Sequence, residues 1–345
     1  MATSQGQTLS SPFTKAVVNS MRKLYPEALA DKSFDNTGLL LEAPFHLAKR
    51  QRNSVLLTVD LTRAVADEAI ERGDSIIVAY HPIIFRGLKS LTLGDPQQDT
   101  LLRLVQEGIS VYSPHTAVDA VPGGMADWLC DVVTGPEAAT HPSLSTTEKP
   151  PLPPRNVSDP PLHTRTTIYP NPSPPEGFET AGMGRLVTFQ ALQPLDSLIK
   201  RISSITQGVV GLPIAIPQGR NINDINISTV ATCPGSGSSI LMKSGQPVAD
   251  LLLTGELSHH EALAAIERGS VVITLFHSNS ERGYLDSVMR SRLQAAVEDE
   301  WDIVRAEWAG TTGTGDTVIS GLLNDSSVAV DVSSEDRDPY QVIAL

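Results

Sequence analysis

The chain has 345 residues, 40% of them apolar, and a formal net charge of −13. This length predicts two domains. The negative charge argues against nucleic acid as the main partner, and no apolar run reaches the roughly 20 residues that a membrane helix needs. The N-terminal residues 1–6 lack the charged and apolar regions of a secretory signal, and two cysteines in so long a chain indicate a reducing compartment. We therefore expect a cytoplasmic protein that is not secreted, with the nucleus or mitochondrion as alternatives.

The first 135 residues alternate between helical and strand patterns. A strand over 54–60, a helix over 62–72 and a strand over 75–80 form a βαβ unit, so the two strands should be parallel. His81 then lies at the carboxyl edge of the sheet. A strand over 109–112 places His115 and Asp119 just beyond its end. Further elements are predicted as helices over 13–24 and 100–107, a helix beginning near Met125, and a strand in the Leu run at 39–41.

A proline-rich segment divides the chain. Twelve of the 25 prolines fall between Pro136 and Pro175, a composition that cannot build a core and is typical of a linker. A short piece at 165–169 could still pair as an edge strand. We expect an N-terminal lobe over 1–135, a linker or insert over 136–180, and a C-terminal lobe over 181–345.

The C-terminal lobe again mixes strands and helices. The patterns predict helices over 194–205 and 262–266, and a helix after Gly283. They predict strands over 182–189, 214–216, 226–232, 250–254, 271–276, 303–308 and 328–332. The fold class is therefore α/β, with two lobes that contain mixed and parallel sheets and pack together. Ligand sites in such folds lie at the carboxyl ends of the strands, so we expect a metal site there, between the lobes.

The strand over 271–276 stops at His277, and Glu281 follows four residues later. Imidazole and carboxylate together suit a transition-metal ion. Ser278 and Glu281 also have the spacing of a capping box, which is the stronger interpretation of this stretch taken alone. The arrangement recurs, however, because five of the eight histidines follow predicted strands within a few residues. Several such histidines at one sheet edge favour a metal site over a cap.

The donor types suit Zn²⁺, Mn²⁺, Fe²⁺ or Ni²⁺, and a carboxylate can bridge two ions. Three other features stay ambiguous or secondary. His259 and His260 could assist the site or cap a helix, and Cys233 is predicted to be a packed thiol. The Gly/Ser turn at 235–239 could hold an anion, but tight packing explains its glycines equally well.

Five motifs in this order resemble the NGG-interacting-factor-three family, also called the GTP cyclohydrolase I type 2 homologues. The motifs are Asp35-Asn36-Thr37-Gly38-Leu39-Leu40, Tyr80-His81-Pro82-Ile83-Ile84-Phe85, His115-Thr116-Ala117-Val118-Asp119, Thr254-Gly255-Glu256 and His277-Ser278-Asn279-Ser280-Glu281-Arg282-Gly283. The resemblance covers almost the whole chain apart from the proline-rich segment. The Tyr80-His81-Pro82 motif and the segment from Asp331 to Pro339 are similar to those of the eukaryotic branch of this family.

The resemblance implies a two-metal centre at His81, Asp119, His277 and Glu281, with Glu281 bridging. It also implies a toroidal hexamer built as a trimer of dimers. Bacterial members carry a His-His pair where this chain has Tyr80 and His81, so the ion held by His277 would lose a ligand. We therefore expect one or two divalent ions per chain, and we take Glu281 and His115 as candidate catalytic residues.

Two functions remain open at this point. The first is a dinuclear metal-dependent hydrolase acting on a small phosphorylated or nucleotide-like substrate. The second is a non-catalytic metal-binding protein, with an interaction, regulatory or metal-handling role in a ring-shaped oligomer that meets protein partners. Dinucleotide-dependent redox chemistry is disfavoured, because no G-x-G-x-x-G follows the first strand of the βαβ unit.

Overall fold

The computed structural model describes residues 10–45, 51–135, 161–203, 211–311 and 323–343. The chain divides into two compact units, and the division does not follow the order of the sequence. Unit 1 contains Met1–Val118 and Tyr284–Arg337, and unit 2 contains Asp119–Gly283 and Asp338–Leu345. The sequence suggested instead that everything after residue 180 forms one lobe.

Unit 1 is built on a five-stranded sheet in the order β1-β4-β3-β2-β13, in which β1 alone is antiparallel to its neighbour. The strands are β1 (Gly38–Leu41), β2 (Ser54–Thr58), β3 (Ile76–Ala79), β4 (Ser110–Ser113) and β13 (Ala329–Val332). Every residue of β2, β3 and β4 is buried, as is usual for parallel strands covered on both faces. The predicted βαβ unit is confirmed, since β2 and β3 are parallel.

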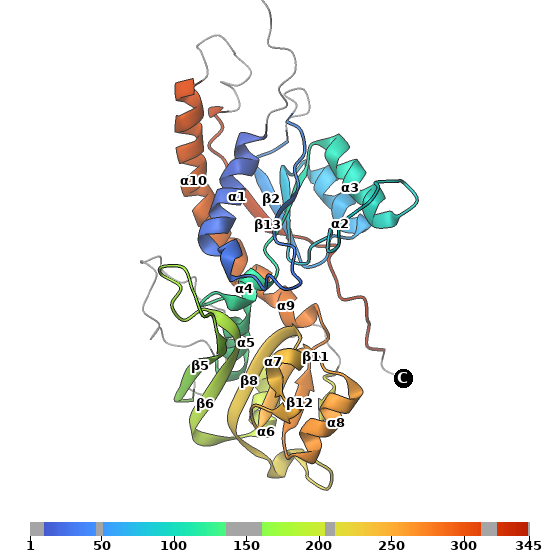
Figure 1. The fold of residues 1–345 in the computed structure, drawn as a ribbon, viewed down its shortest axis with the longest axis vertical. Coiled ribbons are helices and arrows are strands. Elements are labelled where there is room, and N and C mark those ends of the chain that lie inside the picture. Colours follow the sequence, from blue (N-terminus) through green and yellow to red (C-terminus); the bar gives the residue numbers. More distant parts are fainter. Residues whose placement is uncertain (1–9, 46–50, 136–160, 204–210, 312–322, 344–345) are drawn as a thin grey trace, which may run out of the picture. The chain divides into compact units, whose positions relative to one another are not determined.

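Helices cover both faces of this sheet. Figure 1 shows α1 (Pro12–Leu24) and α10 (Arg290–Thr311) on one side, and α2 (Arg63–Arg72) and α3 (Pro96–Glu107) on the other. Thr62 caps the start of α2 by accepting a hydrogen bond from the amide of Val65, and Gly73 ends the helix in the left-handed conformation. The core between α2, α3 and the sheet includes Leu56, Val65, Ile77, Leu104 and Val111.

The strand predicted over 303–308 is wrong, because these residues belong to α10. A helix is favoured there because Val297, Trp301 and Val304 recur at helical spacing, and all three are buried. Trp301 packs edge-on against Phe13 of α1, with ring centroids 5.5 Å apart. The helix predicted after Gly283 is confirmed, although its first part is a π-helical turn over Leu285–Met289.

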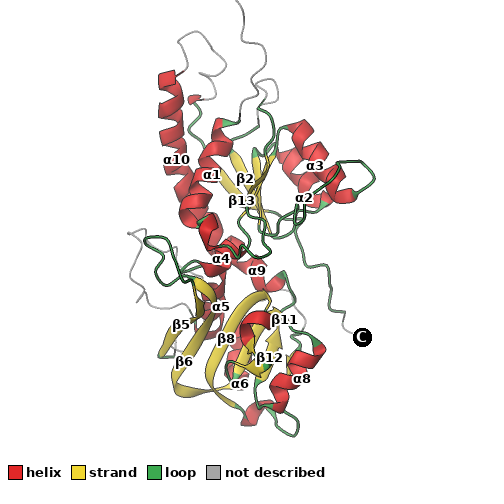
Figure 2. Cartoon of the chain, viewed as in Figure 1, coloured by secondary structure: helices red, strands yellow, loops and turns green. Residues whose placement is uncertain are grey.

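Unit 2 is built on a six-stranded mixed sheet in the order β5-β6-β8-β11-β12-β7. Figure 2 shows its long strands β6 and β8 as curved ribbons. The strands are β5 (His163–Pro170), β6 (Gly182–Pro194), β7 (Ile214–Ala215), β8 (Asn226–Ser236), β11 (Leu251–Glu256) and β12 (Val271–Thr274), with a separate hairpin of β9 (Met242–Lys243) and β10 (Gln246–Pro247). The predicted short edge strands near 165–169 and 214–216 are both confirmed as edges. Residues 136–160 of the proposed linker lie outside the described residues.

Strands β8, β11 and β12 are parallel, so their carboxyl ends share one edge. On one face of the sheet, α7 (Ser238–Leu241) and α8 (His259–Glu267) contribute Leu241 and Ala265 to a core with Ala231, Leu252 and Val272. The other helices of the unit are α5 (Met125–Thr134), α6 (Leu195–Ser203) and α9 (Asn279–Tyr284), while α4 (Thr116–Ala120) spans the boundary between the units. No helix among the described residues combines the length and apolar character needed to cross a bilayer.

Candidate metal centre

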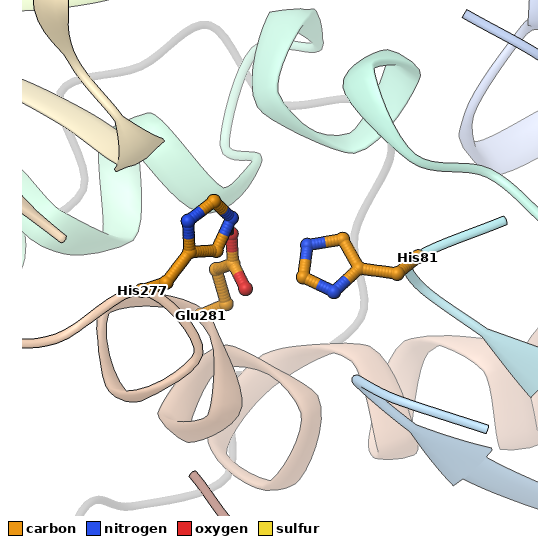
Figure 3. Close-up of side chains that lie close together, drawn as sticks. All are labelled: His81, His277 and Glu281. Atoms are coloured by element: carbon orange, nitrogen blue, oxygen red, sulfur yellow. Dashed lines mark ion pairs between the residues drawn. The ribbon is translucent and has the colours of Figure 1, made fainter. Parts of the chain in front are cut away.

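In unit 2, the loop after β12 brings His277 and Glu281 together. Nε2 of His277 lies 3.4 Å from Oε1 of Glu281, which is 1% exposed (Figure 3). Nδ1 of His277 lies 3.0 Å from Oε1 of Glu256, at the end of the neighbouring strand β11. Phe276, directly before the histidine, has a left-handed backbone with φ of 64°. This conformation is strained for a bulky residue and is typical of functional sites.

Two glycines leave room around this pair. A Cβ on Gly235 would lie 2.8 Å from Oε1 of Glu281 and 2.9 Å from Nε2 of His277. A Cβ on Gly255 would lie 2.6 Å from the Gly235 carbonyl oxygen and 2.9 Å from Cα of His277. The ends of β8, β11 and β12 can therefore approach closely only because both positions lack a side chain.

Asp119 belongs to the same unit and is buried in α4. Burial raises the pKa of the Cys233 thiol, and the carboxylates of Asp119 and Glu281 raise it further. Both carboxylates therefore act on one thiol, which stays protonated at neutral pH. As the sequence predicted, Cys233 is a buried free thiol.

The alternative capping box at Ser278 and Glu281 is not the arrangement that the structure contains. The Ser278 hydroxyl donates to Asp338 at 2.8 Å and accepts from Arg282 at 2.9 Å. A complete capping box is present instead at Ser258 and Glu261, where α8 begins. Gly283, the last residue of the motif, is required for packing, because a Cβ there would lie 2.5 Å from the Trp128 indole.

In unit 1, the carboxyl ends of β3 and β4 carry the other two candidate histidines. Nδ1 of His81 lies 2.9 Å from Oδ1 of Asp60, the residue just beyond β2. Nδ1 of His115 lies 2.6 Å from Oδ1 of Asp35. The ring of the buried Tyr80 lies 4.9 Å from the His81 ring and 5.4 Å from the His115 ring. An aromatic ring thus occupies the position directly before His81.

Within unit 2, His277 and Glu281 offer an imidazole and a carboxylate, donor types that suit a metal ion. His81 of unit 1 offers a second imidazole. His259 and His260 are exposed at the start of α8, with their rings 5.3 Å apart, and neither is among the described residues that could hold a metal ion. The turn at 235–239 leads only into the four-residue helix α7, so its glycines are explained by the close approach of strands.

The sequence did not identify the three carboxylates that hold these histidines. Each of His81, His115 and His277 has Nδ1 within hydrogen-bonding distance of a carboxylate, from Asp60, Asp35 and Glu256 respectively. Metal-binding histidines usually donate one ring N–H to a carboxylate, which leaves the other nitrogen as the ligand. The available signal was position, because Asp60 and Glu256 both stand at the end of a predicted strand.

Residues 13–308 match the family described as Duf34/NIF3 (NGG1p interacting factor 3). The chain is 43% identical over 293 residues to the protein NIF3 homolog of Schizosaccharomyces pombe, covering 85% of this chain and 91% of that protein. It is 37% identical over 296 residues to NGG1-interacting factor 3 of Saccharomyces cerevisiae, covering 83% of this chain and 93% of that protein. Human NIF3-like protein 1 is 30% identical over 354 aligned residues, covering 85% and 90%.

Solved structures have the same fold. The Staphylococcus aureus protein SA1388 matches with a TM-score of 0.64 at 20% identity, covering 96% of this chain and all of that chain. Reduced HcgD from Methanocaldococcus jannaschii matches with a TM-score of 0.60 at 17% identity, covering 94% and 99%. At these identities the likeness concerns the fold alone. The family match and the identities over most of the chain establish that this protein belongs to the NIF3 family.

Proposed function

We propose that this protein binds divalent metal through His81, Asp119, His277 and Glu281, with one or two ions per chain. The observation that carries the proposal is the pairing of Nδ1 of His81 and of His277 with a carboxylate. A proton on Nδ1 leaves Nε2 with the lone pair that a metal requires. Imidazole and carboxylate donors fit Zn²⁺, Mn²⁺, Fe²⁺ or Ni²⁺.

The surroundings of His277 and Glu281 fit an ion. Both donor atoms lie close to Gly235, where a Cβ would be 2.8 Å from Oε1 of Glu281 and 2.9 Å from Nε2 of His277, so the position tolerates no side chain without displacing them. Glu281 is almost fully buried, and its Oε1 lies 3.4 Å from Nε2 of His277, so one cation could be held by both groups.

We further propose that the centre hydrolyses a small phosphorylated or nucleotide-like substrate. A divalent ion bound here would polarise the substrate and lower the pKa of water, which is the chemistry that such ions supply to hydrolases. Glu281 holds and orients the reacting groups, and His115 accepts a proton through Nε2. Both residues lie at carboxyl ends of parallel strands or just beyond them, where α/β proteins bind ligands.

The first test is metal content per chain, measured by mass spectrometry on tag-free protein after incubation with Zn²⁺ or Mn²⁺. The wild type should hold one or two ions, and Glu281→Ala and His277→Ala should each lose at least one. His259→Ala is the matched control, because this exposed histidine of α8 lies outside the metal-binding group. Wild-type protein that holds no metal under these conditions would refute the centre.

The second test is a hydrolysis screen of the metal-loaded protein against phosphomonoesters and nucleotides. Turnover that disappears in Glu281→Ala and persists in His259→Ala supports the hydrolase. A loaded centre with no turnover of any of these substrates refutes it and leaves metal binding without catalysis.

A specific observation favours the second function, a metal-binding protein that acts through partners. The loop between β3 and α3 exposes a series of large apolar side chains, namely Phe85, Leu88, Leu91 and Leu93, at 44% to 73% exposure. Exposed apolar patches commonly mark protein interfaces. We propose that this loop contributes to self-association, and that the oligomer is the ring-shaped hexamer that the family resemblance implies.

Light scattering of the purified protein tests the assembly. A hexamer is expected for the wild type, and a smaller species for the double variant Leu91→Asp and Leu93→Asp. A wild-type monomer would contradict the proposed hexamer.

For the compartment, two buried free cysteines support a reducing environment such as the cytoplasm.

A further inference from the structure

The motif that begins at Asp35 is not used by the proposed metal centre, yet its carboxylate is the most enclosed of the three that hold histidines. The Asp35 side chain is 0% exposed. It accepts hydrogen bonds from Nδ1 of His115 at 2.6 Å, from the amide of Thr116 at 3.2 Å, and from the Thr116 hydroxyl. Burial alone would raise the pKa of Asp35, but the bonds from His115 and Thr116 outweigh it and hold the pKa below its usual value.

The backbone of His115 shows that its orientation is imposed. Its φ of 34° lies in the left-handed region, which is strained for a residue with a side chain. Such a conformation persists only where the surroundings hold it. The polar contacts at this place are the bond that Nδ1 of His115 donates to Asp35 and the bonds that the amide and hydroxyl of the next residue, Thr116, donate to the same carboxylate.

Asp35 also accepts a hydrogen bond from the amide of the next residue, Asn36, at 2.7 Å. The side-chain amide of Asn36 donates to the carbonyl oxygen of Ile84, in the segment that follows His81. The Thr116 hydroxyl that donates to Asp35 also accepts from the amide of Asp31, which closes a second loop of hydrogen bonds. The first motif thus connects the loops that follow β3 and β4, and each loop carries a candidate histidine.

Aromatic rings restrict His115 from the other directions. The ring centroids of Phe34, Phe85 and Tyr80 lie 6.4, 6.3 and 5.4 Å from that of His115, all in edge-to-face orientation. These contacts add to the bond from Nδ1 to Asp35 in orienting the imidazole.

We propose that Asp35 is a positioning residue that fixes His115 in the tautomer with the proton on Nδ1, so that Nε2 is a permanent lone-pair donor at the carboxyl edge of the unit 1 sheet. The lone pair of Nε2 binds either a proton from the reacting water or a metal ion. Which of the two it binds rests on the proposed function, but the tautomer and its control by Asp35 do not.

The test is nitrogen NMR of metal-free protein labelled with ¹⁵N-histidine, at a pH where the ring is neutral, with His115 assigned by the signals lost in His115→Gln. The wild type should show a protonated Nδ1 and an unprotonated Nε2. Asp35→Ala should shift the ratio of the tautomers about tenfold or more toward Nε2–H, as loss of a charge-assisted bond implies. Asp35→Asn, which retains one acceptor oxygen, should give an intermediate ratio.

Asp60→Ala is the matched control, because Asp60 pairs with His81. It should change the His81 signals and leave those of His115 unchanged. A wild-type His115 with its proton on Nε2 overturns the proposal even if the variants do not fold. An unchanged tautomer in folded Asp35→Ala also overturns it.

Addition of Zn²⁺ distinguishes the two roles of Nε2. A large change in the chemical shift of His115 Nε2 on metal binding identifies His115 as a metal ligand, and an unchanged shift identifies it as a proton acceptor. Because the tautomer is measured without metal or substrate, failure of the metal centre in the content assay would leave this result intact, and the two failures are distinguishable.

Discussion

Replacing Gly235 by alanine adds a single methyl group next to the proposed metal centre and so tests it. A Cβ at this position would lie 2.8 Å from Oε1 of Glu281 and 2.9 Å from Nε2 of His277, so it would displace the two donor atoms of the proposed site. We expect Gly235→Ala to lower metal affinity at least tenfold, measured by competition with a chelator. The backbone φ of 58° adds a strain of about 1–2 kcal/mol.

Gly245→Ala separates strain from obstruction. Gly245 has a similar φ of 72°, but no atom lies within 4 Å of the Cβ that would be added. This variant should lose about the same stability as strain alone costs, roughly 1–2 kcal/mol, and should keep its metal. Equal metal affinity in both variants would show that the space beside Gly235 does not serve an ion.

At the scale of elements, a buried ion pair joins α5 to β6. Nε of Arg185 lies 3.0 Å from Oδ2 of Asp127, and both side chains are less than a tenth exposed. Replacing the guanidinium by an apolar chain leaves the buried carboxylate of Asp127 with less compensating positive charge. Such a change typically lowers the free energy of unfolding by about 3–5 kcal/mol. We expect Arg185→Met to lower the free energy of unfolding of unit 2 by about that amount, measured by urea denaturation.

The exposed pair of Lys200 and Asp196 in α6 is the control for this prediction. Lys200 is 78% exposed, so solvent screens its pair with Asp196 and the pair contributes little to stability. Lys200→Met should therefore unfold close to the wild-type urea midpoint. A similar loss in both variants would contradict a special role for the buried pair.

A second contact between elements is sensitive to pH. Glu68 of α2 accepts hydrogen bonds from the Ser333 hydroxyl and from the amide and hydroxyl of Ser334, just after β13. Burial alone would raise the pKa of Glu68, but these bonds outweigh it and hold the pKa below the ordinary value of 4.5. Because the folded pKa is lower than the unfolded one, the stabilisation is present above about pH 4.5 and is lost as pH falls through the folded pKa.

Glu68→Gln should remove this stabilisation at neutral pH, by about 1 kcal/mol for the hydrogen bonds to a charged acceptor. The difference in melting temperature between wild type and variant should be largest at pH 7 and should shrink below pH 4. A difference that is constant over this range would show that the charge of Glu68 does not contribute.

At the scale of the whole molecule, the division into units predicts how fragments behave. Unit 2 is almost continuous in sequence, whereas unit 1 needs the returning segment Tyr284–Arg337. That segment supplies β13, which pairs with β2, and α10, which packs on α1. Without it, the fully buried strand β2 becomes an exposed sheet edge.

We therefore expect a fragment of residues 119–283 to unfold cooperatively, and a fragment of residues 1–118 to aggregate or remain unfolded. Circular dichroism and proton NMR of the two fragments distinguish these outcomes. Cooperative unfolding of the 1–118 fragment alone would contradict the division.

Much of the site was predictable because its signals are local. An apolar run that ends at His81 or His277 specifies both a strand and the position of the residue at its end, and parallel pairing then brings the strand ends of each sheet to one edge of that sheet. The prediction of a strand over 303–308 was wrong because a short apolar run is compatible with both strand and helix periodicity. Only contact with α1 and β13 selects the helix.

The sequence by itself determined the α/β class, the family, and which histidines follow strands, since all three depend on residues close together in the chain. The tertiary structure decided which carboxylate meets each imidazole, because Asp35 and His115 are 80 residues apart and are joined only by the fold. It also decided that Ser278 binds Asp338 rather than capping a helix with Glu281. The pairing of β13 with β2 also depends on residues far apart in the chain. It buries the apolar strand β2 between two neighbouring strands, and short-range sequence patterns do not specify which strand becomes the neighbour.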